Sequence, residues 1–197
     1  MANRYWVGGT GTWNTTSTTN WSASSGGASG ASVPTAADSV FFDQAATYTV
    51  TLTGALTCND ITVSAGTVTF ALGSGPSIAI SGSLSFIAGT SNWPSGVPIT
   101  FNATSTGKTI TTNNKTLPNI ITFDGVGGGW TLGSAISFNS ATCNFTNGTF
   151  DTSSSNYSVT GGSATTFTIS GATVKLNAST LTLTGSSPFT STSGTLN

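Results

Sequence analysis

The chain has 197 residues, of which 40 are Thr, 30 are Ser and 25 are Gly, and only nine carry a formal charge. Those nine are four Lys or Arg and five Asp. The chain contains no Glu and no His. Without imidazole or Glu, the sequence excludes a Ser–His or Cys–His nucleophile, a His-ligated metal and a Glu-based acid–base pair. Four scattered cations are too few for the basic patch that nucleic-acid binding requires. We therefore expect no nucleic-acid partner and no cofactor.

The composition nevertheless predicts a folded domain. Apolar residues make up 36% of the chain and aromatic residues 10%, with a net charge of −1, whereas disordered chains combine low hydrophobicity with high net charge. No apolar stretch approaches the roughly 18–20 residues of a membrane span, so we expect no membrane insertion. The N-terminus has no basic segment followed by an apolar run, and we expect no secretory signal.

Residues 1–43 differ in composition from the rest of the chain. They hold three of the five Trp, at Trp6, Trp13 and Trp21, followed by a polar tract and a short apolar strand around Phe41. We interpret this segment as a cap or anchor and residues 44–197 as the body. A platform for stacking sugar rings is the alternative role for the three Trp.

From residue 48 onward, apolar and polar residues alternate in short runs separated by Gly, Ser and Asn. This pattern predicts strands of three to five residues with one apolar and one hydroxyl-rich face. The helical spacing of apolar residues is not found in any window of about twelve residues. The predicted strands lie at 48–52, 61–63, 68–70, 78–80, 84–86, 130–132, 136–138, 143–145, 157–159, 167–169, 174–176 and 181–183.

The spacing of the apolar residues favours one all-β architecture over another. In the second half, successive anchors from Phe138 to Leu181 lie 7, 5, 7, 10, 7 and 7 residues apart. Three such strands make a coil of about 20–25 residues, which is typical of a parallel β-solenoid (β-helix). A β-sandwich or jelly roll, with turns every 8–12 residues, is the alternative. In a solenoid the aromatic segment 1–43 would cover the open edge of the first coil.

Two stretches share a common template. Residues 61–68 and 143–150 both read apolar-x-apolar-x-x-Gly-Thr-apolar, with the glycine at Gly66 and Gly148. We interpret the template as a loose repeat of the body. The chain stops within this pattern at residue 197, and we expect the natural protein to continue.

Several of these segments resemble repetitive β-rich virion proteins of tailed bacteriophages. The resemblance covers residues 4–43 and about 117–184, somewhat over half of the chain. It rests on the segments YWVGGTGTWN (5–14), TNWS (19–22), 33–43, GWTL (129–132), FTNGTFDT (145–152), NYSVT (156–160), ATVKL (172–176) and STLTLTG (179–185).

The resemblance implies a non-enzymatic structural protein on the surface of a phage particle, either a fibre or a capsid decoration. Its partners would be other virion proteins, further copies of itself in a homo-oligomer, and host-surface glycans. No catalytic residues are carried over from the family. The residues that we expect to anchor the protein to the virion are Tyr5, Trp6, Trp13, Trp21, Phe41 and Phe42. A bacterial surface adhesin is the alternative, and a glycan depolymerase a further one.

The few acidic residues allow two kinds of site. A hydrolytic carboxylate pair of a depolymerase could be formed by Asp124 and Asp151, which follow Phe123 and Phe150 and could each lie at a strand end. Asp38 and Asp43 flank the strand around Phe41 and could bind Ca²⁺. The simpler interpretation is turn chemistry for Asp124 and Asp151 and solvated strand ends for Asp38 and Asp43, and we expect no metal site.

Two further features have simple structural interpretations. Cys58 and Cys143 each lie in an alternating run, which predicts two small buried residues rather than a disulfide framework. Paired Thr residues at 49–53, 67–69 and 180–184 could suggest an ice-binding face. Such a face needs a pair on every coil, and these pairs are irregular. We therefore expect outward Thr to reflect strand propensity.

Overall fold

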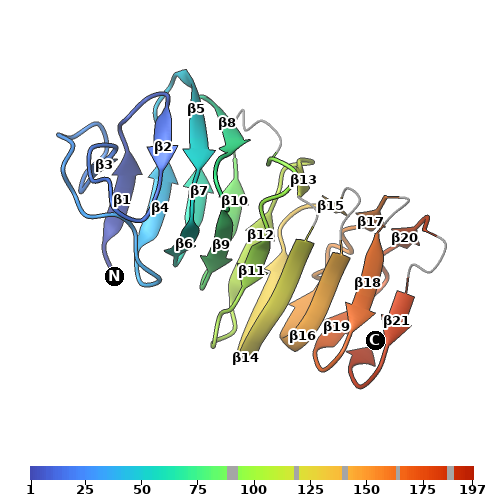
Figure 1. Ribbon diagram of the computed structural model, residues 1–197. Coiled ribbons are helices and arrows are strands. Elements are labelled where there is room, and N and C mark those ends of the chain that lie inside the picture. The colour runs from blue at the N-terminus through green and yellow to red at the C-terminus, as the bar shows by residue number, and fades with distance from the viewer. Residues whose placement is uncertain (88–92, 118–119, 139–141, 163–164, 186–188) are drawn as a thin grey trace.

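The computed structural model describes residues 1–87, 93–117, 120–138, 142–162, 165–185 and 189–197. The described chain is all-β, without helix, and winds into a parallel β-solenoid of about six turns. The coils stack from the N-terminal end to the C-terminal end (Figure 1). This arrangement confirms the predicted solenoid and excludes the sandwich or jelly roll.

The strands of the coils form three sides, here called side 1, side 2 and side 3. Side 1 consists of β1 (Asn3–Trp6), β4 (Ser39–Phe42), β7 (Ile61–Val63), β10 (Leu84–Phe86), β12 (Lys108–Thr111), the second halves of β14 (Ile120–Leu132) and β16 (Thr142–Asp151), β19 (Thr173–Lys175) and β22 (Thr195–Leu196).

Side 2 consists of β6 (Ala55–Cys58), β9 (Ser77–Ile80), β11 (Ile99–Phe101), the first halves of β14 and β16, β18 (Thr166–Ile169) and β21 (Phe189–Ser191). Side 3 is made of two groups of strands. They are β2 (Gly11–Trp13), β5 (Thr47–Leu52) and β8 (Thr67–Leu72), and then β13 (Thr116–Leu117), β15 (Ile136–Phe138), β17 (Val159–Gly161) and β20 (Leu181–Leu183).

The observed coil length agrees with the spacing of the apolar residues. After the first coil, residues paired on adjacent coils are between 20 positions apart, as for Val50 and Phe70, and 26 positions apart, as for Ser85 and Thr111. The first coil is longer, with Gly11 paired to Val50, because the segment between β2 and β4 forms the cap. Short strands with short corners account for most of these intervals, as predicted.

Alternation places the apolar side chains inside the coil. In β9, for example, Ile78 and Ile80 are buried while Ala79 between them faces outward and is half-buried. Because the strands are in register, like side chains stack on one another from coil to coil. The rings of Phe101, Phe123 and Phe145 form such a stack, with centroids 4.9 Å apart at both steps. This spacing matches the distance between hydrogen-bonded strands.

The glycine of the shared template has the same role at two different corners. Gly66 and Gly148 have φ values of 69° and 89°, a conformation that favours glycine. A Cβ would also lie 2.3 Å from the Gln44 carbonyl oxygen at Gly66, and 2.7 Å from the Gly125 carbonyl oxygen at Gly148. However, Gly66 connects side 1 to side 3, whereas Gly148 connects side 2 to side 1. The template is therefore a corner motif and does not mark equivalent positions on successive coils.

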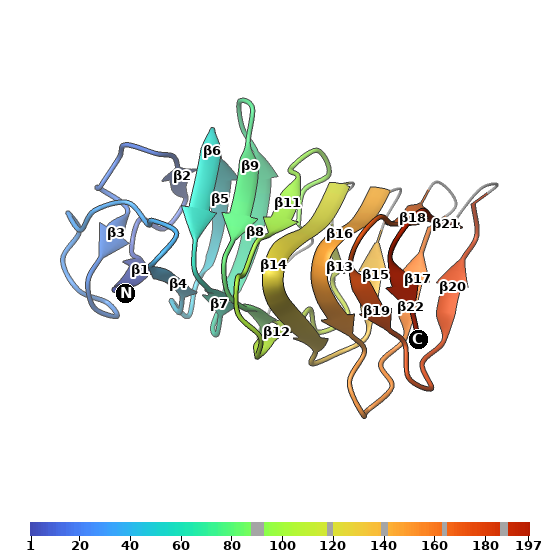
Figure 2. The same cartoon turned by 90° about the horizontal axis from the view of Figure 1, so that it is seen from below.

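The N-terminal end is closed by the predicted cap. The first strand, β1, pairs in parallel with β4 on one edge, and its other edge is covered by β3 (Trp21–Ser22) in the antiparallel direction. Figure 2 shows the loops around β3 folded over this end of the molecule. The antiparallel strand interrupts the parallel ladder and protects the edge of β1 from pairing with another chain.

Candidate functional site

The aromatic residues of the cap fall into two groups. Trp6, Trp13, Trp21 and Phe42 are at most 1% exposed and pack against one another. The ring of Trp21 lies edge-on to both other indoles, with centroids 5.1 Å from Trp6 and 5.3 Å from Trp13. Rings buried in this way cannot stack on a sugar, so the alternative role proposed for the Trp residues does not fit the structure.

Tyr5 and Phe41 form the second group. They are half-buried, occupy paired positions on β1 and β4, and face the outside of side 1. Their rings stack with centroids 4.9 Å apart at an interplanar angle of 19°. Of the six residues expected to anchor the protein, these two are the ones that reach the outer surface. Anchoring to the virion stays a prediction, and Tyr5 and Phe41 are the two predicted residues that a partner could contact.

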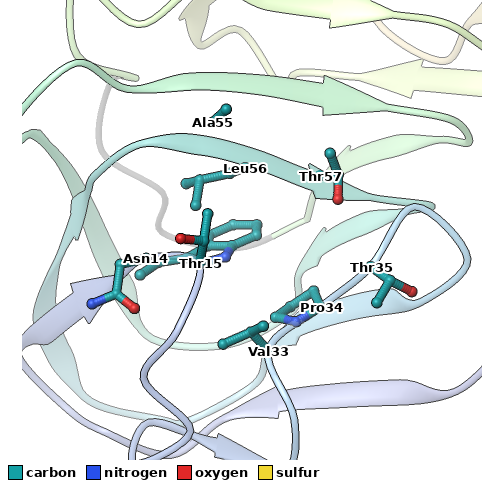
Figure 3. Close-up of a pocket in the computed structure, with 9 residues that line it drawn as sticks. Asn14, Thr15, Val33, Pro34, Thr35, Ala55, Leu56 and Thr57 are labelled. Atoms are coloured by element: carbon teal, nitrogen blue, oxygen red, sulfur yellow. The ribbon is translucent and has the colours of Figure 1, made fainter.

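A cavity of about 180 Å³ lies between the cap and the first strand of side 2. Figure 3 shows Val33 and Pro34 of the cap on one side and Leu56 of β6 on the other, with Asn14 and Thr35 towards opposite ends. The remaining lining residues are Trp13, Thr15, Ala55 and Thr57. None of the nine described residues that line this cavity is charged, so a ligand would be held by apolar contact and neutral hydrogen bonds.

The two carboxylates of the hypothetical hydrolytic pair lie on either side of a corner. Asp124 is exposed in the bulge of β14 and accepts a hydrogen bond of 2.7 Å from Asn147 Nδ2. Asp151 lies at the far end of β16, beyond Gly148. It accepts hydrogen bonds from Ser153 N and from Asn177 Nδ2 on the next coil. Each carboxylate holds turns or adjacent coils together, in agreement with the simpler interpretation.

Asp38 is not the solvated strand end that we expected, because it is buried and has a structural role. It is 6% exposed, and its oxygens accept hydrogen bonds from Ala2 N at 2.9 Å and from Thr35 N and Oγ1 at 3.1 and 2.8 Å. Burial raises the pKa of Asp38, but the hydrogen bonds from Thr35 and Ala2 and the charge of Arg4 outweigh it and lower the pKa overall. Among the described residues, no group of three or more His, Cys, Asp or Glu could hold a metal ion.

Cys58 and Cys143 are buried and unpaired, as expected. They lie on side 2 in two different inward stacks, four coils apart. Burial raises the pKa of both thiols, with a further contribution from Asp60 at Cys58. Protonated, enclosed thiols are poor nucleophiles, so these cysteines serve to fill the core.

The Thr pairs noted in the sequence all face outward on side 3. Thr49 and Thr51 of β5 lie in register with Thr69 and Ala71 of β8, and the third run belongs to β20 near the other end. Between the two groups, residues 93–97 form no strand, and Trp93 instead packs against Phe70 at 4.6 Å. Within the described residues, the Thr pairs therefore do not continue from one group of side-3 strands to the other, as the irregular spacing indicated.

Two features of the structure had no counterpart in the sequence patterns. The first is the cavity, because nothing local in residues 33–35 indicates that they pass beside residues 55–57. The second is Asp60, which joins three coils by accepting hydrogen bonds of 2.7 Å from Ser39 Oγ, Asn59 Nδ2 and Ser83 N. The dipeptide Asn59-Asp60 at a strand end is the kind of signal that could have suggested such a corner.

Comparison with protein-family models, curated proteins and solved structures gives no match for this chain. Among the described residues, no helix has the length and apolar character needed to cross a membrane.

Proposed function

We propose that the protein is a non-enzymatic structural component of a tailed-phage virion, serving as a fibre or capsid decoration on the particle surface. Its capped end attaches to other virion proteins, and its body projects outward. The observation that carries the proposal is a solenoid closed at one end by buried aromatic residues, with an outer surface lined by hydroxyl groups. The resemblance of the sequence segments to repetitive virion proteins supports it.

The outer surface of side 2 illustrates this character. Its central row runs through seven paired strands without a charged residue. The row consists of Thr57, Ala79, Thr100, Thr122, Asn144, Thr168 and Thr190. Such a surface is little affected by salt, because it does not depend on screened charges. It offers hydroxyl and amide groups to host glycans, and copies associated in a homo-oligomer would raise the avidity of such contacts.

Mass spectrometry of purified particles tests the proposal directly. We expect the protein to be present at a fixed ratio to the major capsid or tail proteins. Its absence from particles, with detection instead on the surface of bacterial cells, would contradict a virion role and favour a bacterial adhesin.

The attachment role of the cap can be tested with Phe41→Ala. Removing the outward ring should reduce incorporation into particles at least several-fold, because aromatic residues commonly dominate protein interfaces. Thr62→Ala is the matched control, since Thr62 occupies the next position in the same outward row. Circular dichroism of both variants checks that they fold. Equal incorporation of both variants would show that Phe41 does not contribute to the interface.

A further inference from the structure

The strand β6 has one open edge. It is the first strand of side 2 and, within the described part of the chain, pairs only with β9. No strand precedes β6 on this side among the described residues, and the nearby cap segment around Val33 and Pro34 is not a strand. The cavity of about 180 Å³ separates this segment from β6.

The hydrogen bonds show which backbone groups face the cavity. Ser77 N donates to the Gly54 carbonyl at 3.1 Å, and Leu56 is the register partner of Ile78. In a parallel ladder the backbone groups of alternate residues point to opposite edges. Those of Leu56 therefore point to β9, and those of Ala55 and Thr57 point to the cavity.

The residues on either side of this pair are engaged by the cap. Thr53 N donates to the Trp13 carbonyl at 3.0 Å, and Asn59 N donates to the Asp38 carbonyl at 2.8 Å. Between these two bonds, no hydrogen bond joins the backbone of Ala55 or Thr57 to the cap within the described residues. The free segment is thus bounded at both ends and presents two N–H and two C=O groups in the spacing of a strand.

We infer that this edge binds an extended, uncharged peptide segment of a partner protein as an additional strand of side 2. A peptide backbone is the ligand whose donors and acceptors repeat at the spacing of Ala55 and Thr57. Val33, Pro34 and Leu56 provide an apolar wall for one side chain, and the absence of charge in the lining disfavours an acidic or basic segment. If the proposed function holds, on which the identity of the partner rests, the segment belongs to another virion protein.

The test uses the whole protein and a defined probe. The probe is a synthetic peptide with the sequence of residues 77–81, blocked at both ends, because β9 already pairs with the opposite edge of β6. Binding is followed by amide chemical shifts in ¹H–¹⁵N spectra. We expect saturable shifts centred on Ala55 and Thr57.

Thr57→Pro and Thr57→Val separate the backbone from the side chain. Proline removes the N–H that faces the cavity and leaves the ladder to β9 intact, and it is tolerated at such edge positions. Valine keeps the N–H and the shape of the side chain. We expect Thr57→Pro to bind the peptide at least about tenfold more weakly, because one hydrogen bond and its geometry are lost. Thr57→Val should bind the peptide like the unaltered protein.

Three outcomes would overturn the inference. They are the absence of shifts at millimolar peptide, unchanged binding by Thr57→Pro, and self-association that Thr57→Pro abolishes while the peptide does not bind. The last would assign the edge to a second copy of the chain. Should Thr57→Pro fail to fold, Ala55→Pro removes the other free donor in the same way. The peptide measurement does not depend on virion membership, so its failure is distinct from absence of the protein from particles.

Discussion

At the scale of single residues, Tyr48 links burial to pH dependence. Its side chain points into the solenoid from β5 and is 3% exposed, and its hydroxyl has no hydrogen-bond partner among the described residues. Burial, with a further contribution from the charge of Asp43, raises the pKa of Tyr48 to about 12, compared with about 10 in an unfolded chain. Because the folded state retains this proton more strongly, its stabilising effect is complete below about pH 10 and is lost as the pH rises towards 12.

We predict that Tyr48→Phe makes the protein more resistant to alkali. At pH 7 its free energy of unfolding should equal that of the unaltered protein or exceed it by about 1 kcal/mol, because an unsatisfied buried hydroxyl is removed. Between pH 10 and 12 the variant should lose less stability than the unaltered protein. Urea unfolding across this range measures both effects, with Tyr157→Phe as the control. If Tyr48→Phe and the control follow the same alkaline profile, Tyr48 does not titrate as the structure indicates.

At the scale of strands, the stack of Phe101, Phe123 and Phe145 shows how strand register contributes to the stability of the fold. The rings are at most 1% exposed, and their planes differ by only 11° and 3° at the two steps. The middle ring, Phe123, is covered by a neighbouring ring on both faces only while the three strands stay in register. A slip of one strand by one residue would turn its Phe side chain outward and break the stack, so the stack stabilises both the fold and its alignment.

Phe123→Ala should be among the most destabilising single changes in the body. We expect a loss of about 3–5 kcal/mol in the free energy of unfolding, from lost apolar burial and from the cavity left between two rings. Thr122→Ala is the matched control, because Thr122 precedes it on the same strand and faces outward, and it should cost about 0.5 kcal/mol or less. Chemical denaturation of the two variants measures the difference. Similar losses for both would show that the stack contributes no more than strand propensity.

The sequence predicts the strands better than it predicts their neighbours. Alternation identifies Ile78 and Ile80 as inward, because inside and outside follow directly from the period of two. It does not say on which side of the coil a strand lies, and for that reason the shared template at Gly66 and Gly148 falls on two different sides. The cavity depends on the path of the cap past β6, about twenty residues away in the chain, and local patterns carry no information about such a contact. Local patterns likewise do not show that Trp21 is buried whereas Phe41 reaches the outer surface, although both belong to the same aromatic segment.

At the scale of the whole molecule, the last strand at each end of a solenoid has a neighbour on only one of its two hydrogen-bonding edges. A parallel stack exposes unpaired backbone groups wherever it stops, and such an edge recruits other chains. Here the antiparallel pairing of Tyr5 with Ser22 and of Trp6 with Trp21 reverses the strand direction at the N-terminal end. The indole of Trp21 then packs between those of Trp6 and Trp13 and fixes the cap to the first coil.

Trp21→Ala should therefore open the cap while the body stays folded. Because neighbouring coils contact mainly each other, the loss of about 3–5 kcal/mol expected for a buried Trp should remain at the N-terminal end. Hydrogen exchange should increase in β1 and β3 and stay unchanged in β16 and β19, and sedimentation velocity should show new concentration-dependent association through the exposed edge. Ser25→Ala, an exposed position in the same segment, is the control and should change neither measurement. A uniform increase in exchange along the chain would instead show that the cap and the body unfold as one cooperative unit.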